Sequence, residues 1–257
     1  MKSSPVIELS LPRRAAIALA LCATLAAFGV PPAAAEAVKR AIDLPPSADL
    51  TYIIKARQKG FALSGDATAN WRFSGGKYSF RSVTRAALFG TLIDNRSEGA
   101  VDSYGLAPTQ FVEKRLRHEP WTTTFDRSKQ QISFTESEVN YPLKGGEQDR
   151  NSVLFQLAAV ARAAPEKFVM GAEWKFFVAG RRDADVWTFR VVKLDTVQTG
   201  VGTLDTVHLM RMAPPDAKEQ ALDIWLAPSK EWYPVRLRFT DNDDEYVEQT
   251  LQSITKK

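Results

Sequence analysis

Residues 71–80 read WRFSGGKYSF and contain the clearest structural signal in the chain. Aromatic residues alternate with polar ones on both sides of a glycine pair: Trp71 and Phe73 precede Gly75-Gly76, and Tyr78 and Phe80 follow it. Alternation with a period of two is typical of a half-buried β-strand, and two glycines can adopt the positive φ angles that a tight turn requires. The stretch therefore predicts a β-hairpin.

The same period of two dominates the chain from Leu50 onward. Further alternating apolar sets are Trp174, Phe176 and Val178; Leu222, Ile224 and Leu226; and Val235, Leu237 and Phe239. About ten or more such strands are separated by short polar turns, without the strand–helix alternation of a doubly wound α/β fold. The sequence predicts a mainly β fold, a curled antiparallel sheet of the half-barrel or β-roll kind, and leaves a stack of two sheets open.

One segment, residues 149–163, departs from this pattern. Its apolar residues recur at helical spacing, at Val153, Leu154, Leu157, Ala158, Val160 and Ala161. Asp149, Asn151 or Ser152 can cap the start, and Pro165 lies just past the end. We expect one amphipathic helix packed on the concave face of the sheet. If Asp149 serves only as a cap, its replacement by alanine costs about 1 kcal/mol.

The first thirty-five residues have the pattern of a secretory signal peptide. Lys2 and Arg13-Arg14 are basic, residues 15–30 carry no charge, and Ala33-Ala34-Ala35 offers the small residues of a cleavage site. This pattern predicts cleavage near Ala35-Glu36 and residence in the periplasm of a Gram-negative cell.

The signal peptide sets the expected domain organisation. We expect a cleaved signal peptide (1–35), a flexible lead-in (36–48) that contains Pro45-Pro46, and a single mainly β domain (49–257). After Glu36 no apolar stretch approaches the roughly 18 residues that a transmembrane helix needs, so no transmembrane segment is expected in the mature chain.

Composition narrows the chemistry further. Without residues 1–35 the chain keeps 31 Lys and Arg residues against 29 Asp and Glu residues. This balance argues against a nucleic-acid partner, which requires a concentrated basic face. Cys22 is the only cysteine, so cleavage removes disulfide and thiolate chemistry. A lipoprotein acylated at Cys22 is the alternative, disfavoured by the bulky Leu21 before it.

The sequence contains no complete catalytic or metal-binding motif. The two histidines, His118 and His208, are far apart, and no G-x-S-x-G or H-E-x-x-H motif occurs. Residues 241–245 (DNDDE) begin like a calcium loop, but Tyr246 stands where the loop requires glycine and Gln252 where it requires Glu. We interpret this run as a charged hairpin tip, and we expect no catalytic residue, no metal site and no cofactor.

Several short segments match a known family in order and spacing. They are Tyr104 to Phe111 with Arg115, Phe125-Asp126, Tyr141 to Leu143, Gly146 to Asp149 with Ser152, Gly200, Leu222 to Leu226, and Tyr233 to Arg236. Together they resemble the uncharacterised bacterial family called domain of unknown function 3108, over roughly residues 50–255. The resemblance implies an exported, mostly β protein of Gram-negative envelopes and supplies no catalytic residues.

The matching residues are first interpreted as structural. The set comprises Pro108, Phe111, Phe125, Asp126, Pro142, Ser152, Trp225 and Pro234. Pro108 and Pro142 are expected to set turns before strands, and Phe125-Asp126 to close a strand at a turn. Four polar residues are a separate candidate site, a cluster at the mouth of a groove: Arg115, Gln148, Asp149 and Arg236.

Six tryptophans and fourteen phenylalanines suit either a solid core or a curved sheet with an apolar groove. On the second interpretation the chain is a binding or carrier protein, or an envelope-assembly factor. Its partner would be an apolar, lipid-like or extended ligand or an envelope protein. A carboxylate-dependent envelope hydrolase and a scaffold that uses a sheet edge are the alternatives.

Overall fold

The computed structural model describes residues 38–87, 89–212, 221–242 and 245–257. These residues all belong to one compact unit that spans residues 32–257. The predicted signal peptide with Cys22 lies outside the described residues.

The described chain consists of fifteen strands, one α-helix and two short 3-10 helices. The first strands are β1 (Ala48–Gln58), β2 (Phe61–Ser74), β3 (Lys77–Ala86), β4 (Gly90–Asp102), β5 (Gly105–Arg115), β6 (Trp121–Asp126), β7 (Gln131–Phe134), β8 (Ser137–Pro142) and β9 (Gln148–Asp149). They are followed by α1 (Ser152–Ala163), η1 (Pro165–Lys167), β10 (Glu173–Ala179), β11 (Ala184–Thr199), β12 (Gly202–Met212), β13 (Ala221–Leu226), η2 (Pro228–Lys230), β14 (Pro234–Asn242) and β15 (Glu245–Lys256).

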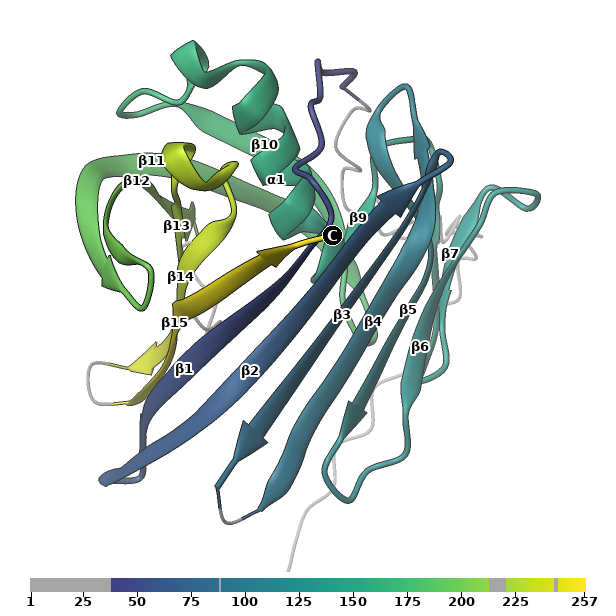
Figure 1. The fold of residues 1–257 in the computed structure, drawn as a ribbon. Helices are drawn as coiled ribbons and strands as arrows, with labels where there is room; N and C mark the ends of the chain where they lie inside the picture. Colours follow the sequence, from purple (N-terminus) through teal and green to yellow (C-terminus); the bar gives the residue numbers. More distant parts are fainter. Residues whose placement is uncertain (1–37, 88, 213–220, 243–244) are drawn as a thin grey trace, which may run out of the picture. The chain divides into compact units, whose positions relative to one another are not determined.

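All fifteen strands form one sheet in the order β8-β7-β6-β5-β4-β3-β2-β1-β15-β14-β13-β12-β11-β10-β9. Consecutive strands pair, except β8 and β9, which form the two edges, and β1 pairs with β15 in the middle of the sheet (Figure 1). Every pair is antiparallel except β9–β10, which is parallel. The mainly β fold and the single curled sheet are confirmed, whereas the half-barrel or β-roll geometry stays a prediction.

The predicted hairpin is the β2–β3 pair. Trp71 lies opposite Phe80 and Ser74 opposite Lys77 in the register. Gly75 and Gly76 connect the strands with φ angles of 58° and 72°, the left-handed region in which glycine has no steric penalty. Inward residues therefore follow the predicted alternation.

Helix α1 begins three residues later than expected and is enclosed rather than amphipathic. Ten consecutive residues, 152–161, are buried, so the helix presents no broad solvent face. Phe155 stacks on Trp71 with ring centroids 4.4 Å apart and lies 4.7 Å from Phe80. The polar Gln156 is satisfied inside, because its Oε1 accepts from the Leu106 amide at 2.7 Å. The expected amphipathic character is thus not confirmed.

The two ends of the sheet pack against each other. Phe125 and Ile132 from β6 and β7 share a buried cluster with Phe177 of β10. The Thr123 hydroxyl donates to the Gly180 carbonyl oxygen at 2.7 Å, which links β6 to the β10–β11 connection. Strands at opposite ends of one sheet can meet only if the sheet curls, so these contacts show that the sheet is curled.

The expected flexible lead-in is packed in its described part, residues 38–47. The Asp43 amide donates to the Ala159 carbonyl oxygen of α1 at 3.0 Å. The Trp71 indole donates to the Pro45 carbonyl oxygen at 2.9 Å. Buried donors need such partners, so Asp43 and Pro45 are held against the domain, and the boundary at residue 49 stays a prediction.

The Phe155 packing makes the first testable prediction. Replacing Phe155 by alanine removes the ring that joins α1 to β2 and β3, and should lower the free energy of unfolding by about 3–5 kcal/mol. Phe61→Ala is the matched control: Phe61 is 70% exposed, so its loss should change stability by about 0.5 kcal/mol or less. Urea unfolding measures both, and equal effects would contradict the enclosed helix.

Candidate functional site

A cavity of about 550 Å³ lies on the inner face of the sheet, beside the start of α1. Its floor consists of inward residues in two registered rows across β2 to β5. One row is Ala69, Ser82, Asn95 and Glu113, and the next is Ala67, Thr84, Ile93 and Arg115. Hereafter this space is the central cavity.

Small side chains explain why the central cavity exists. Inward positions nearer α1 carry Trp71 and Phe80, whose rings fill the space against Phe155. Farther along the same strands, inward positions carry Ala69 and Ser82, which are too short to reach across the curl. Protein interiors normally contain no such space, so a run of small inward residues marks it as a feature of the fold.

Much of the opposite lining is apolar. It includes Leu154, Phe155, Val178, Trp187, Leu222, Leu237, Phe239 and Val247. These side chains come from α1 and from β10 to β15, whereas the small residues come from β2 and β3. An apolar chain can therefore contact protein on both sides.

Charged residues line another part of the central cavity, and most of their charges are paired. Glu113 forms an ion pair with Arg115, and only 6% of the Glu113 side chain is exposed. Arg211 lies 3.8 Å from Asp185 and its guanidinium stacks over the Trp187 ring at 3.9 Å. Such pairs hold the charges of the lining in place.

Asp149 lies just behind the cavity, fully buried at the start of α1. Its Oδ1 accepts the amides of Asn151 and Ser152, both at 2.8 Å, and its Oδ2 accepts the Ser97 hydroxyl of β4 at 2.5 Å. The Ser152 hydroxyl is 2.9 Å from the Asp149 amide, which completes a reciprocal cap. Asp149 thus accepts two amides at the start of the helix from a position before the N-cap residue, and it also joins α1 to β4.

Burial dominates the protonation of this carboxyl. It raises the pKa of Asp149 to about 6, against the downward effect of the hydrogen bonds from Ser97, Ser152 and Asn151. Tyr78, 3.0 Å from the Ser97 hydroxyl, also has a raised pKa because of burial and the nearby Asp149 charge. The Asp149 carboxyl therefore titrates close to neutrality.

The structure divides the predicted polar cluster into three places. Arg115 lines the central cavity. Gln148 and Asp149 are buried at the start of α1, and the Gln148 amide donates to the Leu106 carbonyl oxygen at 2.7 Å. Arg236 lies over the Trp225 ring and 3.9 Å from Glu248, and it does not line the cavity. A single cluster is wrong because the alternation along β14 turns Leu237 inward and Arg236 outward.

Most of the residues that carry the family resemblance contribute to packing, turns or hydrogen bonds within the fold. Phe111 and Phe125 are buried, Ser152 is the first residue of α1, Trp225 stacks on His208 at 4.1 Å, and the Pro234 carbonyl oxygen accepts the Tyr52 hydroxyl at 2.9 Å. Asp126 ends β6 and accepts the amides of Ser128 and Lys129, as expected for a turn.

The two prolines are not placed as predicted. Pro108 lies inside β5 at a register irregularity opposite Gly99, and Pro142 is the last residue of the edge strand β8. Neither precedes a strand. Proline cannot donate to a strand ladder, so it is tolerated at bulges and edges.

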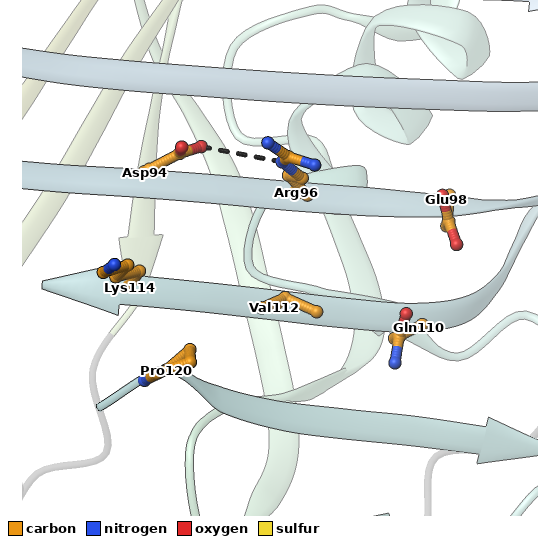
Figure 2. Close-up of a pocket in the computed structure, with 7 residues that line it drawn as sticks. All are labelled: Asp94, Arg96, Glu98, Gln110, Val112, Lys114 and Pro120. Atoms are coloured by element: carbon orange, nitrogen blue, oxygen red, sulfur yellow. Dashed lines mark ion pairs between the residues drawn. The ribbon is translucent and has the colours of Figure 1, made fainter.

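The outer face of β4 and β5 carries a second, shallower hollow of about 290 Å³ (Figure 2). It is lined by the residues that alternate with the cavity residues, among them Asp94, Arg96 and Lys114. Asp94 pairs with Arg81 at 2.7 Å and with Arg96 at 3.9 Å. Because these ion pairs are partly exposed, we interpret the hollow as a solvated surface.

Neither a metal-binding cluster nor a membrane-spanning helix is found in the described part of the chain. No group of three or more His, Asp or Glu side chains is placed to hold a metal ion there. β14 ends at Asn242 and β15 begins at Glu245, and the two strands pair antiparallel; residues 243–244 of the acidic run lie outside the described residues. Within the described residues no helix has the length and apolar character to cross a bilayer.

Sequence reasoning missed several residues at this site. Glu113 was detectable, since the inward Phe111 and a period of two place Glu113 and Arg115 on the same face. Arg150 and Asn151 carry no such signal, because their positions depend on how the start of α1 meets β4 and β10. Ser97 was missed for the same reason.

A family model described as a protein of unknown function (DUF3108) matches residues 51–252, which confirms the resemblance inferred from the sequence. No curated protein matches the chain.

Three solved structures are distantly similar to the chain. A DUF1089 family protein from Pseudomonas aeruginosa has a TM-score of 0.35 and 8% identity, covering 66% of this chain and 87% of that chain. A protein with a YmcC-like fold from Bacteroides fragilis has a TM-score of 0.34 and 9% identity, covering 85% of this chain and 100% of that chain. The lipoprotein LppX of Mycobacterium tuberculosis has a TM-score of 0.22 and 11% identity, covering 78% of this chain and 84% of that chain. These scores are below 0.5 and carry no argument about function.

The buried Asp149 makes stability depend on pH. Its pKa is about 6 in the folded protein against an ordinary value of 3.8, so the folded state holds this proton more tightly. The stabilisation is complete below about pH 4 and is lost as the pH rises through 6, about 3 kcal/mol in all. Asp149→Asn cannot titrate, so the unfolding free energy of the wild type minus that of the variant should fall, by about 2 kcal/mol of this amount between pH 4.5 and 7.

Urea unfolding at a series of pH values measures this difference. Asp126→Asn is the control, because the pKa of Asp126 is lowered to about 2 and its titration lies below the window from pH 4.5 to 7. A wild-type minus Asp149→Asn difference that stays flat across the window would show that Asp149 is ionised throughout.

Proposed function

We propose that this chain, which belongs to the DUF3108 family of proteins of unknown function, is an exported binding protein that holds an apolar ligand in its central cavity. The observation that carries the proposal is the cavity itself, with apolar side chains on one side and small residues on the other. Ligand sites are typically concave, about 300–1,000 Å³ in volume and mostly apolar. The central cavity, at about 550 Å³, has these properties.

The shape of the lining favours an extended ligand over a compact one. The cavity extends from Phe155 of α1 to Gln58 at the tip of the β1–β2 hairpin. A flexible acyl chain can follow such a path and bury its methylene groups against both walls. Each buried methylene contributes about 0.8 kcal/mol, so a chain gains affinity without requiring matched polar partners.

The cellular place of the protein is part of the same proposal. The signal-peptide pattern of residues 1–35 supports export, and a periplasmic carrier or assembly factor would meet lipid-like molecules or acylated proteins there. A cavity that shields an acyl chain from water suits transfer between membranes.

The hydrolase alternative finds less support in the geometry. A carboxylate acid catalyst needs a raised pKa and access to substrate. Asp149 has the raised pKa, but it is fully buried and occupied by three donors. Glu113 and Asp185 line the cavity, but arginines lie beside both. We therefore propose a non-catalytic role.

The scaffold alternative depends on an open sheet edge. Edge strand β8 is six residues long, exposed, and ends in Pro142. Short edges that carry proline resist strand addition. The edge therefore offers less support for a partner protein than the cavity offers for a ligand.

Filling the central cavity tests the proposed function. Ser82→Phe places a ring among the small residues and should weaken binding of the neutral fluorescent probe N-phenylnaphthylamine about tenfold or more, since the ring takes the ligand's space. Ser79→Phe, on the exposed outer face of the same strand, is the matched control and should leave binding unchanged. Fluorescence titration measures the affinity, and urea unfolding checks that both variants fold.

Native mass spectrometry of protein purified from the periplasm provides a second readout. A co-purified apolar molecule that Ser82→Phe excludes and Ser79→Phe retains would support the proposal. Equal probe binding by the wild type and both variants would show that the cavity is not the binding site.

A further inference from the structure

We propose that the ligand of the central cavity is an anionic amphiphile, whose acyl chain lies in the cavity and whose carboxylate or phosphate binds Arg150 and Asn151. This inference rests on the proposed function and adds the chemical class of the ligand. The two residues come directly before the first turn of α1 and both line the cavity.

Arg150 is the cation of the lining whose charge is not matched by a neighbour. The other two arginines of the lining, Arg115 and Arg211, form ion pairs with Glu113 and Asp185. Arg150 is exposed and forms no ion pair among the described residues, although Asp183 lines the same cavity. An arginine fork offers two parallel donors, which is the geometry that carboxylate and phosphate oxygens accept best.

Asn151 supplies an independent observation. Only 7% of the residue is exposed, and its side-chain Nδ2 is buried without a hydrogen-bond partner in the described part of the chain. It occupies the N-cap position of α1, yet its side chain makes no cap hydrogen bond. Buried donors are rarely unpaired, and one in a cavity beside an unpaired arginine is placed to meet an acceptor on a ligand.

The helix adds a favourable field but not the donors themselves. The start of a twelve-residue helix carries partial positive charge. The amides of Asn151 and Ser152 are already taken by Asp149, so the headgroup would be bound through side chains. Recognition therefore depends on Arg150 and Asn151 rather than on the helix end alone.

Gly180 leaves room for the Arg150 side chain. A Cβ atom at residue 180 would lie 2.7 Å from one guanidinium nitrogen of Arg150. The φ angle of Gly180 is not in the left-handed region, so the backbone does not require glycine there. The absence of a side chain instead permits the guanidinium to lie against the β10–β11 connection at the cavity wall.

The experiment compares dodecyl amphiphiles that share one chain and differ in their heads. Isothermal titration of the full mature chain with dodecanoate, dodecyl phosphate, dodecanol and dodecyltrimethylammonium should rank at least one anion well above the neutral and cationic probes. Arg150→Gln should weaken binding of that anion about tenfold or more and leave dodecanol unchanged, since a charge-assisted hydrogen bond is lost. Asn151→Ala should give a smaller loss in the same direction.

Two variants separate a headgroup site from a general charge effect. Arg96→Gln removes the same charge from the outer face of β4 and should leave every affinity unchanged. Gly180→Ala keeps Arg150 but displaces its guanidinium. It should weaken binding of the anion and leave the affinity for dodecanol unchanged. Preference for dodecanoate or for dodecyl phosphate then assigns the head as a carboxylate or a phosphate.

Two results would overturn the inference. One is equal affinity of the wild type for dodecanol and both anions, and the other is an equal effect of Arg150→Gln and Arg96→Gln on anion binding. If N-phenylnaphthylamine still binds in a Ser82-dependent manner, only the headgroup site fails. If that binding is absent too, the proposed function fails with it.

Discussion

The burial of α1 on every side is the constraint on which the rest of the structure depends. A helix with ten consecutive buried residues cannot lie on an open surface, because its apolar side chains would face water on the outer side. The sheet meets this requirement by curling until β5, β9 and β10 all contact the helix. Phe155 against Trp71 and the buried contacts between β6, β7 and β10 are consequences of that enclosure.

The hydrogen bonds of Asp149 connect the enclosed helix to the sheet. One carboxyl satisfies two amides at the helix start and one hydroxyl on β4, so the helix cannot shift without leaving buried groups unpaired. The same burial that makes this connection specific raises the pKa of Asp149, because the surroundings disfavour the charged form. Structural precision and sensitivity to pH thus share one cause.

The central cavity is the space that the enclosed helix does not fill. Near α1 the inward residues are large and the interior is solid; farther along β2 and β3 they are small and the interior is open. Alternation along each strand separates this space from the solvated outer face. On β4, Asn95 faces the cavity. Asp94 and Arg96 line the outer hollow (Figure 2).

The local pattern of the sequence was sufficient to predict the strands, the hairpin at Gly75-Gly76 and the segment that contains α1. It was also sufficient to predict the resemblance to the DUF3108 family. Each of these depends on residues close together in the chain, whose spacing alone sets which face they occupy. Glu113 was within reach of the same reasoning, although it was overlooked. What only the tertiary structure decided is the curl. It brings Ser97 to Asp149, encloses a helix expected to be amphipathic, places Arg150 and Asn151 in a cavity, and leaves Arg236 on another face. These outcomes depend on the packing of side chains distant in sequence, and no local period encodes that packing.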